Sequence, residues 1–183
     1  MNAVTKEFLG SPDTWRDAKI ELDDIHNVWG GKRITIYGDG TAFVKIVDLG
    51  QTAETYRMEL ETEQVPPLFE AVLDNDVLSM QNAIALPDED EICTRLSITN
   101  AQGDTRSVCQ WELAATNERF VDVRNLLSAV AERMGDLGAQ LVATVSPTPS
   151  TEAAYSAEAS PAFSPATPAQ SAAFDLPESA AGD

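Results

Sequence analysis

Alternating apolar and polar residues define the clearest element of the chain, a β-hairpin around a Gly-Asp-Gly sequence. Two runs rich in β-branched residues, 32–37 and 41–48, flank that sequence. Pairing Tyr37 with Thr41 collects the apolar side chains on one face, whereas a slip by one residue brings a lysine onto it. The pattern therefore predicts the Tyr37–Thr41 register, with a three-residue loop in which Gly40 takes the positive φ of a bulge.

The same pattern predicts further strands and two helices. A weakly alternating strand over residues 18–22 precedes a Trp-Gly-Gly turn, and a half-buried strand covers residues 56–60. A short helix is predicted from an N-cap at Thr62 to a polar Asp-Asn-Asp turn at 74–76. A longer amphipathic helix is predicted over residues 117–134, followed by a glycine suited to a helix C-terminus.

A second hairpin is predicted over residues 92–113, with its turn at 100–104, and two registers remain open. A two-residue loop would turn Cys109 toward the core with Trp111 and point Cys93 away from it. A slip by one residue would place both cysteines on one face, diagonally related. We prefer the first register because it buries Trp111. Two thiols in a chain of this length do not form a disulfide scaffold.

The order of elements, β-β-β-β-α-β-β-α, predicts a two-layer α+β domain. Its antiparallel sheet would have about five to six strands, with the helices on one face. Composition changes sharply near residue 141, because 25 of the last 42 residues are Ala, Ser or Pro. Such a segment buries too little apolar area to offset its chain entropy. We therefore predict an irregular N-terminal segment over 1–17, the α+β domain over 18–135, and a disordered acidic tail over 136–183.

The charge of the chain limits its partners. Its 183 residues carry 30 acidic and 12 basic side chains, a net charge of −18. Nucleic acids and anionic membranes bind cationic surfaces, so both are poor partners, whereas a basic protein is favoured. The N-terminal residues lack the apolar core of a secretory signal, and no apolar run approaches the length of a membrane span. The sequence thus predicts a cytoplasmic protein.

The residues Ile-Thr-Ile-Tyr-Gly-Asp-Gly-Thr at 34–41 resemble the opening hairpin of a group of small bacterial α+β domains, which carry an I-x-I-x-x-D-G-T pattern. Residues 75–78, Asn-Asp-Val-Leu, and the L-x-x-x-N-x-x-G pattern at 96–103 are similar to later parts of that group. The resemblance spans roughly residues 18–134 and implies the α+β fold. It implies no chemistry, since the group has no characterised function.

The sequence contains no recognisable catalytic or cofactor-binding motif. The only histidine, His26, lies near Asp23 and Asp24, but a metal site would need further ligands that the sequence does not supply. Asp74 and Asp76 have the spacing of paired catalytic carboxylates, yet a helix-ending turn explains them more simply. We therefore predict no cofactor and no metal, and we favour a non-catalytic protein over an enzyme.

The candidate contacts with a protein partner are an acidic run, two tryptophans and a motif in the tail. The acidic run would be a solvated loop, a contact with a basic partner or a cation site. The tryptophans would be exposed anchors or packing residues, and the tail motif a docking peptide or part of a linker. The residues are Asp88, Glu89, Asp90, Glu91, Trp15, Trp29, Phe174 and Leu176.

The sequence therefore favours a protein-interaction module that docks on a basic partner, in the manner of an inhibitor, an immunity protein or an accessory subunit. The alternatives are a small-molecule-binding or enzymatic domain with an unrecognised site, and a structural subunit of a larger assembly.

Overall fold

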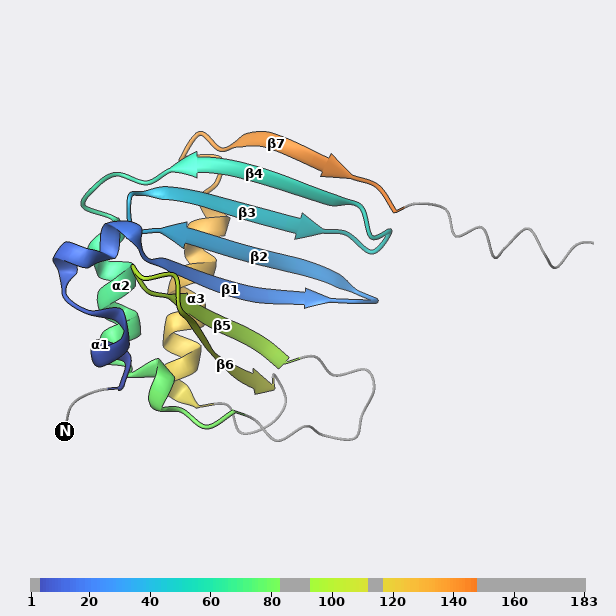
Figure 1. The fold of residues 1–183 in the computed structure, drawn as a ribbon. Coiled ribbons are helices and arrows are strands. Elements are labelled where there is room, and N and C mark those ends of the chain that lie inside the picture. Colours follow the sequence, from blue (N-terminus) through green and yellow to red (C-terminus); the bar gives the residue numbers. More distant parts are fainter. Residues whose placement is uncertain (1–3, 83–92, 112–116, 148–183) are drawn as a thin grey trace, which may run out of the picture. The chain divides into compact units, whose positions relative to one another are not determined.

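The described part of the chain forms one antiparallel sheet with helices on one face (Figure 1). The computed structural model describes residues 4–82, 93–111 and 117–147. Within these residues the sheet has seven strands in the order β6-β5-β1-β2-β3-β4-β7. The strands are β1 Lys19–His26, β2 Gly30–Tyr37, β3 Thr41–Val47, β4 Ala53–Glu59, β5 Cys93–Thr99, β6 Thr105–Trp111 and β7 Gln140–Val145.

The helical elements gather behind the sheet, as Figure 1 shows for α2 and α3. The predicted α+β class and the order of the main elements are confirmed, with a seventh strand beyond the expected number. The helical elements are α1 Val4–Leu9, the 3₁₀ helix η1 Pro12–Asp17, α2 Val65–Asp74, the 3₁₀ helix η2 Val77–Ser79 and α3 Glu118–Glu132.

The β2–β3 hairpin has the predicted register. Ile36 pairs with Ala42 and Ile34 with Val44, and all four side chains are buried. The loop between the strands has three residues, and Gly40 has a φ of +98°. A Cβ atom at Gly40 would lie 2.9 Å from the Leu60 carbonyl oxygen, so both the φ angle and the close approach require glycine.

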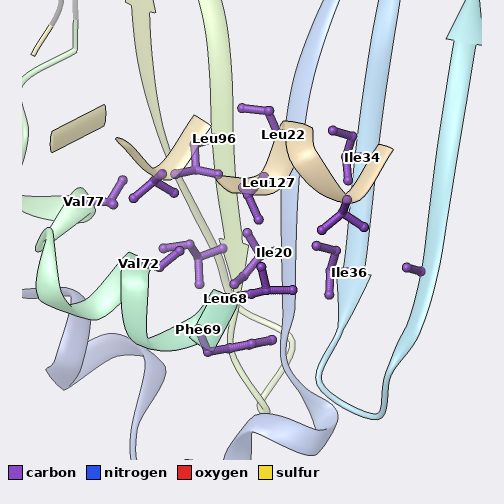
Figure 2. Close-up of a cluster of buried hydrophobic side chains, with 14 of the residues drawn as sticks. Ile20, Leu22, Ile34, Ile36, Leu68, Phe69, Val72, Val77, Leu96 and Leu127 are labelled. Carbon is purple, nitrogen blue, oxygen red and sulfur yellow. The ribbon is translucent and has the colours of Figure 1, made fainter. Parts of the chain in front are cut away.

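The hydrophobic core lies between the sheet and the two longer helices (Figure 2). Strands β1, β2 and β5 contribute alternate residues, as expected for a sheet with one buried face. Helix α2 adds a stripe of apolar side chains, and α3 adds Leu127. The labelled core residues are Ile20, Leu22, Ile34, Ile36, Leu68, Phe69, Val72, Val77, Leu96 and Leu127.

Helix α2 begins later than predicted. Thr62 lies in a turn, and the helix starts at Val65 with Gln64 in the N-cap position. The reason is the pair Pro66 and Pro67, which lack the backbone N–H that an earlier start would place inside the helix. In the first turn that N–H has no intrahelical acceptor, so both prolines are tolerated there.

The N-terminal segment, predicted as irregular over residues 1–17, is helical within its described part. Leu9 and Trp15 anchor α1 and η1, since both side chains are almost fully buried. The Trp15 ring stacks on Phe69 with the ring centroids 5.4 Å apart. Two six-residue helices are too short to show a clear helical period, so the sequence pattern missed them.

The β5–β6 hairpin has the register that the sequence analysis placed second. Arg95 pairs with Cys109 and Leu96 with Val108, so Cys93 and Cys109 lie diagonally on one face. They form a disulfide with the Cα atoms 5.6 Å apart. The prediction of a buried Cys109 and an outward Cys93 is therefore wrong. The preferred register placed Cys109 and Trp111 on the core side of the hairpin, whereas Val108 is the residue buried there.

The predicted start of the tail at residue 136 is too early. Strand β7 pairs along β4, with Val145 opposite Ala53 and Gln140 opposite Arg57. The compact unit that contains the sheet runs to Thr148. The Ala- and Ser-rich composition concealed a strand that contains three residues of high β-propensity, Val142, Thr144 and Val145.

Asp76 joins the helix-ending turn after α2 to the N-terminal helix. The predicted turn is confirmed, since α2 ends at Asp74 and Asp76 adopts a left-handed φ of 41°. The Thr5 backbone N–H donates to Asp76 Oδ1 at 2.9 Å, and the Leu78 N–H donates to Thr5 Oγ1 at 2.9 Å. Asp76 therefore has a structural role, and no catalytic pair with Asp74 is needed to explain it.

Replacing Asp76 by asparagine should make the free energy of unfolding less sensitive to pH in the acidic range. Partial burial raises the pKa of Asp76, but hydrogen bonds from Thr5 and Ser79 and the charge of Arg119 outweigh burial and hold the pKa below 3.8. Because the folded pKa is depressed, the stabilisation is complete above pH 3.8 and is lost as the pH falls through the folded pKa. Asparagine tolerates the left-handed φ and should cost about 1 kcal/mol at neutral pH.

Urea unfolding of wild type and Asp76→Asn between neutral and acidic pH tests this expectation. The two unfolding free energies should converge as the pH falls below 3.8, because the protonated carboxyl no longer carries charge. A constant difference across the whole range would mean that the Asp76 charge contributes nothing to folding.

Candidate protein-interaction surface

The most exposed large apolar side chains of the described residues lie in three neighbouring segments. Trp29 and Leu49 are 65% and 72% exposed. They lie in the β1–β2 turn and the β3–β4 turn, and the third segment is β7. We call this set the distal surface, and its six residues are Val28, Trp29, Leu49, Leu141, Val142 and Val145, all more than half exposed.

The two turns and the end of β7 are adjacent in space. Gln51 Nε2 donates to the Val28 carbonyl oxygen at 3.3 Å and so links the two turns. A Cβ atom at Gly30 would lie 2.1 Å from the Val47 carbonyl oxygen, which shows how closely the first turn approaches β3. Val145 lies opposite Ala53, the first residue of β4 after the second turn. The two turns and the end of β7 thus lie at the ends of the strands away from α1 and α2 (Figure 1), and Leu141 and Val142 extend the distal surface back along β7.

Hydrogen bonds hold both turns in place. His26 Nδ1 accepts from the backbone N–H groups of Val28 and Trp29 at 2.9 and 3.2 Å. Asp48 Oδ1 accepts from the Thr52 N–H at 2.8 Å in the second turn. The single histidine therefore supports the backbone of the turn that carries Trp29. Apolar side chains on a fixed backbone lose little further entropy on binding, which favours a contact site.

Acidic groups lie beside the distal surface. Glu54 is on β4, next to β7, and its Oε2 accepts a hydrogen bond from the Tyr56 hydroxyl at 2.6 Å. This hydrogen bond raises the pKa of Tyr56. Arg57, further along β4, forms an ion pair with Glu59. The positive charge of Arg57, which lies opposite Gln140 of β7, is thus partly neutralised within β4 itself.

The sheet face away from the helices is polar and internally paired. Arg33 forms an ion pair with Asp23, and this hydrogen bond raises the pKa of Arg33. Glu21 accepts from the Thr35 hydroxyl at 3.1 Å and lies 3.9 Å from the Lys19 amine. These contacts pair several of the charged side chains on this face of the described sheet with one another.

The predicted polar cluster around His26 is divided by the sheet. Asp23 faces Arg33 on the polar side, whereas Asp24 lies on the helix side. There Asp24 accepts from the Thr94 hydroxyl at 2.8 Å and lies 3.6 Å from an Arg124 nitrogen. Among the described residues, no group of three or more His, Cys, Asp or Glu side chains could hold a metal ion.

An apolar groove lies between α2 and α3. Its volume is about 330 Å³. Leu60, Pro67, Leu126 and Leu137 line it, with Arg133 at its border. A ligand site normally adds several convergent polar groups or shifted pKa values to such a hollow. Here the polar lining side chains are Glu63, Gln64 and Arg133, and the small-molecule alternative would use this groove.

The two tryptophans named from the sequence have opposite environments. Trp29 is exposed within the distal surface, whereas Trp15 is 5% exposed under Phe69 and cannot present its ring to a partner. The other candidates, residues 88–91 with Phe174 and Leu176, lie outside the described residues. Sequence reasoning missed Leu49 and Val145. The available signal for Leu49 was an apolar residue inside an Asp-Leu-Gly turn.

Comparison of the chain with protein-family models, with curated proteins and with solved structures found no match. In the part of the chain that the structure describes, no helix is long and apolar enough to cross a membrane.

Proposed function

We propose that this protein is a non-catalytic interaction module that binds a basic protein through the distal surface. The observation that carries the proposal is the pairing of Trp29 and Leu49 on two fixed, adjacent turns in a chain of net charge −18. Exposed tryptophans surrounded by smaller apolar residues are frequent centres of protein interfaces. The acidic charge would attract a basic partner and speed its encounter.

An inhibitor or immunity-type protein is one version of this function, since neutralising a basic toxin or nuclease favours a strongly acidic surface. An accessory subunit of a basic assembly is another. The sequence prediction of a cytoplasmic protein belongs to the same proposal. Against that prediction, the Cys93–Cys109 disulfide favours an oxidising compartment, because cytosolic thiols are normally kept reduced. A test of the proposal therefore includes partners from both compartments.

Affinity capture with matched variants of the full chain tests the proposal. The double variant Trp29→Ala/Leu49→Ala should lose the partner, with an affinity at least ten times weaker, because these are the two most exposed apolar side chains of the surface. Its melting temperature should stay near that of wild type, since neither side chain is part of the core.

The control is Tyr37→Ala/Leu126→Ala, which removes two partly exposed apolar side chains outside the distal surface. It should retain the partner. Binding should also weaken between about 0.1 M and about 1 M salt, since screening shortens the range of charge interactions from about 10 Å to about 3 Å. Equal capture of the partner by both double variants would exclude the distal surface as the binding site. An affinity that does not change with salt concentration would exclude an electrostatic contribution to binding.

A further inference from the structure

The two edges of the sheet differ in how they are protected. At the β6 edge, the Cys109 N–H donates to Asn82 Oδ1 at 3.0 Å and Gln110 Nε2 donates to the Gln81 carbonyl oxygen at 2.9 Å. The segment after η2 thus covers part of that edge, and the disulfide joins β6 to its neighbour. The β7 edge is different, because all six of its residues are exposed.

Among the described residues, strand β7 has a bulge between its pairs with Thr55 and Tyr56, but it lacks the other usual features that stop a sheet edge from pairing. It ends the strand order, so its outer side meets no other strand among the described residues. Its sequence contains no charged residue and no proline. Natural proteins normally protect an edge with lysine, proline, a covering segment or a very short strand. An uncharged edge strand with no outer partner among residues 4–82, 93–111 and 117–147 is therefore suited to pair, away from its bulge, with a strand from another molecule.

We infer that the basic partner adds an extended strand to the outer edge of β7. This inference rests on the proposed function and specifies how the partner binds. Val145 belongs both to β7 and to the distal surface and lies opposite Ala53, so a strand paired with β7 would end beside the β3–β4 turn. A strand of six residues alone is smaller than a typical stable interface of about 1,600 Å². The partner must therefore cover the neighbouring apolar turns as well.

Charge favours a basic partner over a second copy of this chain. Two copies would bring two net charges of −18 together along a strand that itself supplies no compensating charge. A strand flanked by lysine or arginine would instead meet Glu54 beside β7 and the acidic field of the whole domain. The expected occupant is thus an extended segment with β-branched residues at its centre and basic residues at its ends.

Two synthetic peptides of equal charge test strand addition to the full chain. One is Lys-Lys-Thr-Val-Thr-Val-Thr-Val-Lys-Lys, and the other replaces each valine by proline, which prevents strand pairing. The valine peptide should slow amide hydrogen exchange in residues 140–145 at least tenfold, and the proline peptide should leave it unchanged. Equal effects of both peptides, or no effect of either, would overturn the inference.

The proline variants Ala143→Pro and Thr144→Pro locate the pairing edge. Neighbouring residues of a strand direct their N–H groups to opposite edges, so one variant removes an outward donor and the other a donor to β4. One variant should bind the valine peptide at least tenfold more weakly while its melting temperature stays near wild type. If both bind as wild type does, the peptide does not pair with β7.

The failure of strand addition is distinguishable from the failure of the proposed function. Capture that depends on Trp29 and Leu49, without any protection of β7, would retain the interaction surface and reject the strand. Slower exchange in β7 with rising protein concentration and no peptide would identify a second copy as the occupant, and would reject the basic strand.

Discussion

Replacing Phe69 by alanine should lower the free energy of unfolding by about 3–5 kcal/mol, the largest effect that we expect from one substitution. Phe69 is fully buried, lies at the centre of α2, and stacks on Trp15 with an interplanar angle of 19°. The substitution leaves a cavity between α2 and the N-terminal segment, so Trp15 loses its packing partner. Urea unfolding followed by tryptophan fluorescence and by circular dichroism measures the loss.

Phe43→Ala is the matched control for Phe69→Ala. Phe43 lies on the polar face of the sheet, partly exposed, with its ring edge-on to Tyr37 at 6.2 Å. An aromatic pair of this kind contributes about 0.5–1.5 kcal/mol beyond the buried area. The loss at Phe43 should therefore be clearly smaller. Equal losses at the two positions would contradict the assignment of the core to the helix side.

Reduction of the Cys93–Cys109 disulfide should cost about 3 kcal/mol of unfolding free energy and roughly 10 °C of melting temperature. The bond closes a loop with a sequence separation of 16 residues and so restricts the unfolded chain. Both cysteines are only half-buried, which allows a soluble reductant to reach them. Thermal unfolding with and without reductant measures the effect.

The double variant Cys93→Ser/Cys109→Ser controls for other actions of the reductant. Its melting temperature should match that of the reduced wild type and should not change when reductant is added. Mass spectrometry of the alkylated native protein shows whether the bond is present before reduction. Two alkylated thiols in the untreated protein, or equal melting temperatures in both conditions, would contradict a stabilising disulfide.

The sequence predicted those parts of the fold in which neighbouring residues determine the structure. The β2–β3 register followed from alternation alone, because only one register keeps a lysine off the apolar face. In the β5–β6 hairpin both registers gave acceptable faces. The preferred register was chosen because it buries Trp111, whereas in the structure Leu96 pairs with Val108 on the core side.

Local sequence patterns did not predict the parts of the fold that depend on contacts between residues far apart in the chain. Trp15 and Trp29 looked alike in the sequence, and only the packing of η1 on Phe69 separates the buried ring from the exposed one. Strand β7 finds its partner in β4, far back in the chain, so composition suggested a tail. The distal surface likewise depends on the adjacency of two turns and a strand that the sequence separates widely.

The late position of β7 has a consequence for the protein during its synthesis. Strand β4 is complete at Glu59, but the residues that pair with it begin at Gln140, roughly 80 residues later. At about 5–20 residues per second, a ribosome needs on the order of 4–16 s to supply them. Over that interval the nascent sheet would present β4 as its outer strand. The charged pair Arg57 and Glu59 on β4 gives the unfinished chain the protection against aggregation that β7 itself lacks.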